Sequence, residues 1–188
     1  MPLERWKRTI DTNLTSPFIV AKEYLKQLET APDAVKDKAS VVIIGNTAGK
    51  YGKLQSHCQG DDITALMYGF TLSLKNEIVK IASKARVNTI GPGWVVTVKS
   101  EESLKNSAVV YSALATTPLK KIAMPQDIAP QVVFLSSQKV SAHITGQVLM
   151  IEGGMEGELQ EVALSNIEYL RPHFKADFLT NQRTSNVD

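Results

Sequence analysis

The first part of the chain carries a long amphipathic pattern. Over residues 2–28 apolar side chains recur every three or four positions, which is the spacing of one helical face. Pro2 suits the first turn of a helix, and Ala31-Pro32-Asp33 ends the pattern. We therefore predict a helix over residues 2–28. Its apolar positions are Trp6, Ile10, Leu14, Phe18, Ala21, Leu25 and Leu28.

Strand and helix patterns then alternate. Residues 40–45 form a short, continuously apolar, β-branched run, which is typical of a strand covered on both faces. Helical spacing over residues 61–83 is followed by a second such strand at residues 86–90. A third helix begins at Pro125, and a third strand at residues 146–151 precedes Gly153-Gly154. The alternation predicts a three-layer α/β fold with a short parallel sheet of about three strands.

Two stretches fall outside the alternation. Residues 98–118 are mixed and weakly helical. Residues 158–188 begin with one apolar stripe and become polar after Pro172. We interpret them as a C-terminal extension, first a docking helix and then a flexible end, that follows an α/β domain at residues 1–157. The stripe consists of Leu159, Ala163, Ile167 and Leu170.

Composition narrows the environment and the partners. Lys plus Arg number 21 against 19 for Asp plus Glu, and the basic residues are scattered, which argues against nucleic acid as a partner. No apolar segment has the length of a membrane span. Cys58 is the single cysteine, and the first residues are charged where a signal peptide would be apolar. We expect a cytoplasmic protein.

The motifs in the second half of the chain point to a family. Residues 86–97, Arg-Val-Asn-Thr-Ile-Gly-Pro-Gly-Trp-Val-Val-Thr, resemble the strand and Pro-Gly turn of the short-chain dehydrogenases/reductases. The resemblance covers about residues 4–157. Its further motifs are Asp11-Thr12-Asn13-Leu14, Pro118-Leu119, Pro125-Gln126-Asp127-Ile128-Ala129, Phe134-Leu135-Ser136-Ser137, Ile144-Thr145-Gly146-Gln147-Val148 and Gly153-Gly154.

The resemblance also implies what this sequence lacks. Members of that family begin with a strand and a Gly-rich turn that receives the cofactor pyrophosphate, and no G-x-G-x-x-G follows a strand here. The match places Asn46, Gln59 and Ile63 at the family's catalytic Ser, Tyr and Lys positions, so that only Asn13 remains of the usual set. We therefore expect a truncated member that binds no NAD(P) or other cofactor and transfers no hydride.

Two groups of polar residues are candidates for replacement chemistry. His57 and Asp61 have the i,i+4 spacing that lets a carboxylate orient an imidazole, although Asp61 and Asp62 equally suit a solvent-exposed helix start. Asn46 and Thr47 follow a strand at the edge where α/β sheets bind ligands. They suit either substrate binding or capping of the next turn.

Other candidates are less specific. Trp94 and Thr97 are expected to face the same crevice, where Trp94 could instead fill the space of a cofactor, and Asn13 completes the substrate-side set. The three His residues lie far apart in sequence without Cys partners, so we expect no metal. A lone thiol such as Cys58 is more often inert than nucleophilic.

Several functions remain open at this point. One is a non-redox enzyme, such as an isomerase, cyclase or lyase, acting on a small organic ligand through His57, Gln59, Asn46 and Asp61. A second is a catalytically inactive pseudoenzyme that works by binding, and a third is an oxidoreductase-family fragment. In each case we expect a homodimer or a complex with a full-length relative, through the helices at 2–28 and 61–83 and an open strand edge at 41–44.

Overall fold

The protein is described by a computed structural model, in which residues 2–52, 65–155 and 157 are placed well enough to describe. Their strands form one parallel sheet in the order β1-β2-β3, from β1 (Ser40–Ile44), β2 (Arg86–Pro92) and β3 (Val148–Ile151). Ser40 pairs with Arg86 and Thr89 with Val148 at the start of the two ladders. The predicted α/β class and three-stranded parallel sheet are confirmed.

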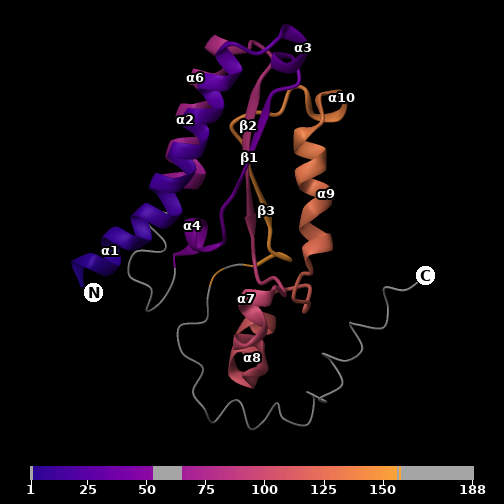
Figure 1. Ribbon diagram of the computed structural model, residues 1–188. Helices are drawn as coiled ribbons and strands as arrows, with labels where there is room; N and C mark the ends of the chain where they lie inside the picture. The colour runs from indigo at the N-terminus through magenta and orange to yellow at the C-terminus, as the bar shows by residue number, and fades with distance from the viewer. Residues whose placement is uncertain (1, 53–64, 156, 158–188) are drawn as a thin grey trace.

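Helices cover both faces of this sheet (Figure 1). The longer helices are α1 (Leu3–Ile10), α2 (Ser16–Glu29), α6 (Thr71–Ile81), α8 (Ser107–Thr116) and α9 (Pro125–Ser136). The short elements are α3 (Asp33–Lys36), α4 (Ala48–Tyr51), α7 (Val98–Glu101), η3 (Ser103–Lys105) and α10 (Gln138–Ser141). The region 98–118, which showed only a weak pattern, thus folds as α7, η3 and α8.

The main core lies between the sheet and the pair α2 and α6. Leu28 of α2, Ile43 of β1, Ile78 of α6 and Val87 of β2 are buried there in one cluster. A buried hydroxyl pair adds to it, because Thr71 Oγ1 and Thr89 Oγ1 lie 2.6 Å apart and join α6 to β2. These contacts explain why the apolar positions of the two helices recur at helical spacing.

Helix α9 covers the opposite face and is tied to the sheet by polar contacts. The buried Arg86 guanidinium donates to the Leu135 carbonyl at the end of α9 at 2.6 Å. Burial lowers the pKa of Arg86. Asn88 Nδ2 donates to the Ile144 carbonyl at 2.8 Å and its Oδ1 accepts from the Gln147 N–H at 3.0 Å, so β2 also fixes the entry into β3.

Both long helices contain a π-helical stretch. The predicted helix over 2–28 is interrupted by η1 (Asp11–Thr15), and η2 (Ala65–Phe70) precedes α6. Periodicity alone misses such stretches, since one wider turn disturbs a pattern of 3.6 residues only slightly. The two stretches pack against each other, and π-helical turns are frequent at functional sites.

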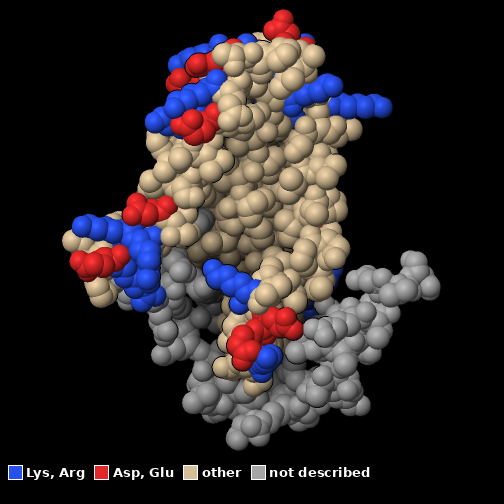
Figure 2. Space-filling view, viewed as in Figure 1, with Lys and Arg blue, Asp and Glu red and all other residues tan. Residues whose placement is uncertain are grey.

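The predicted coverage of residues 40–45 on both faces holds for most of β1, with α2 and α6 on one face and α9 on the other, but not for its last residue. Ile43 is buried, whereas Ile44 is 52% exposed. Ile44 is the last residue of β1, which is an outer strand of the described sheet, whereas β2 lies between two neighbours. The surface over β1 between α2 and α9 carries no charged side chain in its central part (Figure 2).

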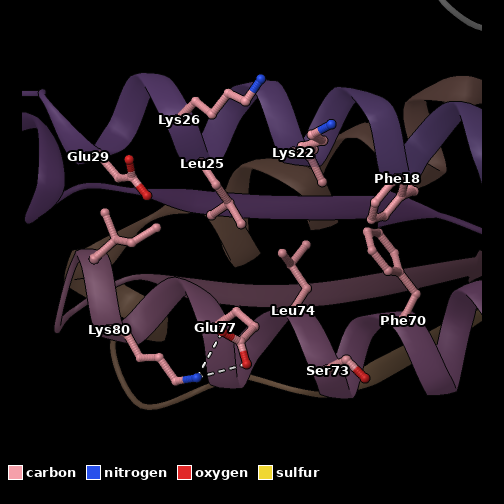
Figure 3. Close-up of a pocket in the computed structure, with 12 residues that line it drawn as sticks. Phe18, Lys22, Leu25, Lys26, Glu29, Phe70, Ser73, Leu74, Glu77 and Lys80 are labelled. Atoms are coloured by element: carbon pink, nitrogen blue, oxygen red, sulfur yellow. Dashed lines mark hydrogen bonds and ion pairs between the residues drawn. The ribbon is translucent and has the colours of Figure 1, made fainter.

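A groove runs along the outer side of α2 and α6 (Figure 3), with a volume of about 620 Å³. Phe18 and Phe70 face each other across it, edge to face, with ring centroids 6.3 Å apart. Leu25 and Leu74 point into it, and charged side chains follow its length, among them Lys80, which pairs with Glu77 at 2.8 Å. The groove is thus an apolar strip bordered by charged side chains.

Three predictions concern residues outside the described part. The docking helix over residues 158–171, the flexible end after it and the domain boundary between residues 157 and 158 stay predictions. The beginning of the predicted helix over 61–83 also lies there, and its described remainder is η2 and α6.

Candidate functional site

The carboxyl ends of the three strands meet at one edge of the sheet, where a short turn follows each strand. Backbone hydrogen bonds join these turns. The N–H groups of Gly45 and Thr47 donate to the carbonyls of Ile90 and Pro92 at 2.8 and 3.1 Å, and Gly93 donates to Ile151 at 2.9 Å. A parallel sheet binds its ligands at this edge. The edge is therefore the candidate site.

Gly93 is required by a close approach within this edge. A Cβ atom at Gly93 would lie 2.9 Å from the Glu152 Cα, closer than two such atoms can pack. The absence of a side chain lets the Pro92-Gly93 turn rest directly on the end of β3. The Pro-Gly motif seen in the sequence thus sets the spacing between two of the strand ends.

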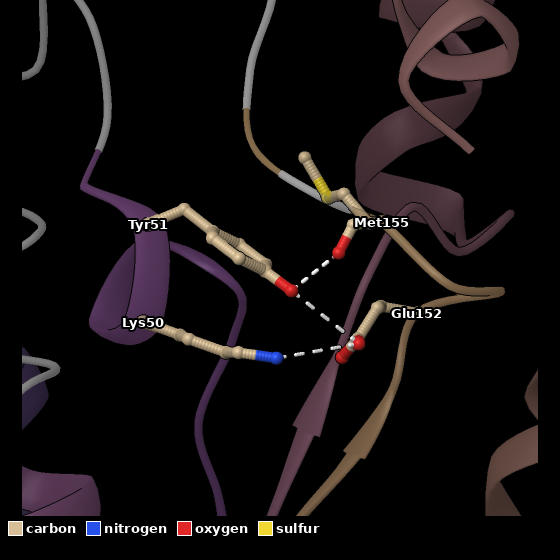
Figure 4. Close-up of polar contacts among 4 residues, drawn as sticks. All are labelled: Lys50, Tyr51, Glu152 and Met155. Atoms are coloured by element: carbon tan, nitrogen blue, oxygen red, sulfur yellow. Dashed lines mark hydrogen bonds and ion pairs between the residues drawn. The ribbon is translucent and has the colours of Figure 1, made fainter. Parts of the chain in front are cut away.

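A polar cluster holds the β1 end against the β3 end (Figure 4). Glu152 Oε1 lies 3.6 Å from Lys50 Nζ and 3.5 Å from the Tyr51 hydroxyl, both on α4. The Tyr51 hydroxyl also makes a short hydrogen bond to the Met155 carbonyl. Lys50 Nζ lies 4.7 Å from the centroid of the Tyr51 ring. The cluster thereby ties α4 to the chain that leaves β3.

The electrostatics of the cluster favour the charged lysine. The hydrogen bond with Tyr51 and the nearby Glu152 carboxylate raise the pKa of Lys50. Glu152 is the more enclosed partner, with a side chain 11% exposed against 40% for Lys50. Its second oxygen, Oε2, is buried without a hydrogen-bond partner among the described residues. Glu152 therefore depends on Lys50 and Tyr51 for compensation of its charge.

Asn46 and Thr47, two of the predicted site residues, lie in the turn after β1. Asn46 Oδ1 accepts a hydrogen bond from the Ala48 N–H at 2.7 Å. This contact supports the capping interpretation of Asn46 and occupies its carbonyl oxygen. Thr47 is the N-cap position of α4 and is half-buried. Both residues shape the turn on which Lys50 and Tyr51 are carried.

Trp94 and Thr97 both follow the Pro-Gly turn, but Trp94 packs in an apolar cluster and Thr97 caps a helix. The half-buried Trp94 packs against the cluster formed by Leu104, Ala113, Leu114 and Ile122, under α8. Thr97 is exposed and caps α7, with its hydroxyl accepting from the Ser100 N–H at 3.2 Å. Trp94 thus remains at the crevice, whereas Thr97 serves the local helix.

A small cavity of about 230 Å³ lies beside the Glu152 cluster. Trp94 and Leu119 line part of it with apolar surface, and Leu119 is 71% exposed. The ion pair of Lys121 and Asp127, at 2.8 Å, supplies polar lining together with Glu152. The cavity therefore combines an apolar wall with acidic and basic groups at the carboxyl edge of the sheet.

The remaining predicted residues are only partly placed. Asn13 is half-buried in η1, the π-helical stretch that packs against η2. His57, Gln59 and Asp61 lie outside the described residues, so the predicted acid/base group stays a prediction. Within the described ranges no three His, Cys, Asp or Glu residues come together as metal ligands.

The residues that the structure adds are Lys50, Tyr51 and Glu152. A signal was available in the sequence, because Lys50-Tyr51 closely follows the first strand and Glu152 directly follows the third. Polar residues just after parallel strands gather at one edge. The same rule that points to Asn46 and Thr47 therefore also applies to these three residues.

Comparison with known proteins agrees with this architecture. The family described as Enoyl-(Acyl carrier protein) reductase matches residues 1–156. The chain is 30% identical to the 3-oxoacyl-[acyl-carrier-protein] reductase of Vibrio cholerae, over 82% of this chain and 59% of that protein. It is also 30% identical to the acetoacetyl-CoA reductase of Cupriavidus necator, over 80% of this chain and 56% of that protein.

A solved structure gives the same result. The 4-hydroxyisoleucine dehydrogenase complexed with NADH is 30% identical and superposes with a TM-score of 0.68, covering 77% of this chain and 56% of that chain. The fold is that of a Rossmann-like dehydrogenase. The chain belongs to the short-chain dehydrogenase/reductase family, as its motifs predicted, and it spans less than two thirds of the length of these relatives.

These relatives correct the functional prediction. They are named reductases and dehydrogenases, and nothing among them indicates isomerase, cyclase, lyase or purely binding roles. The expectation of a non-redox enzyme or pseudoenzyme is therefore wrong. That expectation rested on Asn46, Gln59 and Ile63 standing at the family's catalytic positions, whereas the relatives share the rest of the pattern and are named oxidoreductases.

A pyrophosphate needs a Gly-rich turn that opens a helix. The turn after β1 leads into α4, which has only four residues, and Asn46 already accepts the Ala48 N–H at its start. This turn thus does not fit the pyrophosphate of NAD(P). The predicted lack of cofactor binding by this chain stays a prediction.

None of the helices in the described ranges is long and apolar enough to cross a membrane.

Proposed function

We propose that this chain is the substrate-side part of an NAD(P)-linked oxidoreductase that interconverts a carbonyl and a hydroxyl group on a small organic substrate. One observation carries the proposal: the carboxyl ends of β1, β2 and β3 join around one crevice, and its polar cluster and cavity lie there. The names of the relatives support the reaction class and favour 3-oxoacyl thioesters as substrates.

In this proposal each described part of the site has a physical role. Trp94 provides an apolar wall for the acyl chain, and the Lys121–Asp127 pair and Glu152 provide polar lining. Lys50 and Tyr51 hold the crevice at a fixed width through Glu152 and Met155. The chain's own described residues thus bind and orient the substrate, and the nucleotide is held elsewhere in the fold.

The groove between α2 and α6 supports a further part of the proposal, namely pairing of two copies or of this chain with a full-length relative. Phe18, Leu25, Phe70 and Leu74 line it with apolar surface, which is unusual for an outer face. Lys22, Lys26, Glu29 and Glu77 also line it and offer ionic pairing to an identical surface. Burial of such a strip would favour association.

Substrate binding can be tested on the chain by itself. Acetoacetyl-CoA would be titrated calorimetrically against butyryl-CoA, which lacks the 3-oxo group. We expect acetoacetyl-CoA to bind saturably and at least tenfold more tightly. Equal affinities, or no saturable binding of either compound, would contradict the proposed substrate class.

Two matched variants locate the binding. Leu119→Trp adds a ring at the cavity lining and is expected to weaken acetoacetyl-CoA binding at least tenfold. Val98→Trp adds the same ring at a position 94% exposed and outside the cavity lining, and should leave the affinity unchanged. Equal effects of both variants would place the binding elsewhere.

A further inference from the structure

The cavity beside the Glu152 cluster is small for a ligand site. Its volume is about 230 Å³, whereas sites for drug-sized ligands usually measure roughly 300 to 1,000 Å³. A water-sized group occupies about 30 Å³, so the cavity has room for roughly eight non-hydrogen atoms of a ligand. An acetoacetyl group, with four carbon and two oxygen atoms, fits within this space, and a much longer acyl group does not.

Trp94 forms the inner wall of this cavity and is held from two sides. It packs against the buried apolar cluster under α8, which lies beyond the carboxyl ends of the strands (Figure 1). Its carbonyl accepts a hydrogen bond from the N–H of Ala123, another lining residue, at 2.9 Å. Because a packed apolar cluster leaves few voids, Trp94 cannot move aside without repacking its neighbours. The wall is therefore rigid.

Leu119 lies on the outer side of the cavity. Its side chain is 71% exposed, whereas Trp94 is half-buried. The Leu119 N–H donates to the Gly153 carbonyl at 3.1 Å, which fixes the turn that carries Leu119 against the end of β3. The cavity therefore opens to solvent beside Leu119 and is closed at Trp94. An acyl chain that enters past Leu119 ends against the Trp94 ring.

We infer that Trp94 sets the length of the acyl chain that the site accepts, with a limit of about six carbon atoms. Acetoacetyl and 3-oxohexanoyl thioesters bind, and 3-oxooctanoyl thioesters are excluded. The inference deepens the proposed function and rests on it for the place of the substrate. Each carbon atom beyond the limit has to displace the Trp94 ring from its cluster, and forcing extra methylene groups into a packed region is unfavourable.

The test uses the full 188-residue chain and its own fluorescence. Trp6 and Trp94 are its two tryptophans, and Trp6 lies on α1, away from the cavity lining. Trp6→Phe thus leaves Trp94 as the reporter of a ligand at the closed end. Acetoacetyl-CoA and 3-oxohexanoyl-CoA should change its emission saturably. We expect 3-oxooctanoyl-CoA to bind at least tenfold more weakly than 3-oxohexanoyl-CoA.

Matched variants separate Trp94 from other causes of selectivity, with binding measured by calorimetry. Trp94→Ala opens the closed end and should bind 3-oxooctanoyl-CoA at least as tightly as 3-oxohexanoyl-CoA. Trp6→Ala removes the same ring from α1 and should keep the order of the parent protein. Circular dichroism and the melting temperature show whether each variant folds. Trp94→Leu, which keeps an apolar side chain in the cluster, replaces Trp94→Ala if that variant does not fold.

Two results would overturn the inference and leave the proposed function standing. One is equal affinity of the parent protein for the 3-oxohexanoyl and 3-oxooctanoyl compounds. The other is a folded Trp94 variant that keeps the parent's order of affinities. If none of the three compounds binds saturably, the proposed substrate class fails and the inference fails with it, so the two failures are distinguishable.

Discussion

β1 and β2 are neighbouring strands that differ both in sequence character and in surroundings. Arg86, Val87, Asn88, Thr89 and Ile90 of β2 are all buried, although three of them are polar. In β1, which is entirely apolar after Ser40, Ile43 is the buried residue and Ile44 is half exposed. Burial in this protein therefore follows the position of a strand in the sheet more closely than the hydrophobicity of its residues.

The largest effect that tests this contrast comes from truncating matched isoleucines. Ile90 and Ile44 are register partners in the two strands, 0 and 52% exposed. We expect Ile90→Ala to lower the free energy of unfolding by about 2 to 5 kcal/mol, because it leaves a cavity in the core. Ile44→Ala should cost less than about 1 kcal/mol in the isolated chain. Urea denaturation measures both, and equal losses would contradict the contrast.

An intermediate loss of stability is expected at the end of β1, where polar contacts rather than burial hold the chain. Tyr51→Phe removes the hydroxyl that bonds to the Met155 carbonyl and approaches Glu152. The variant should lose about 1 kcal/mol of unfolding free energy, the usual net contribution of one hydrogen bond. Tyr111→Phe on α8 is a matched control that is expected to lose less. A Tyr51→Phe protein as stable as its parent would show that the cluster does not hold the strand ends together.

The smallest effect is electrostatic and lies on α9, which covers β1 and β2. The bond with Lys121 and then the Met124 N–H lower the pKa of Asp127. A lowered folded pKa gives stability that is present above the unfolded value, about 3.9, and that is lost as pH falls through the folded value. When the pH falls from about 5 to about 2, the melting temperature of Asp127→Asn should therefore fall less than that of the parent protein. The effect should be well below 1 kcal/mol, since the side chain is 35% exposed. An unchanged pH profile would contradict this assignment.

The candidate site was only partly accessible to sequence reasoning. The rule that ligands bind after parallel strands pointed to the edge at which the polar cluster lies, because it depends only on the strand assignments. It could not separate a capping residue such as Asn46 from a residue that crosses to another strand end, such as Glu152 with Lys50. That difference depends on side-chain directions and on contacts between residues 102 positions apart in the sequence, which no local pattern records.

The sequence by itself determined the α/β class, the three strands and the family, because periodicity and turn motifs such as Pro92-Gly93 and Gly153-Gly154 are local properties. It also predicted the helices around α2, α6 and α9, but not the π-helical stretches or α8. Only the tertiary structure decided which residues of each strand are buried, and that Lys50, Tyr51 and Glu152 form one cluster. The physical reason is that burial and pairing are set by neighbours in space, and the same apolar run suits a covered strand and an uncovered one.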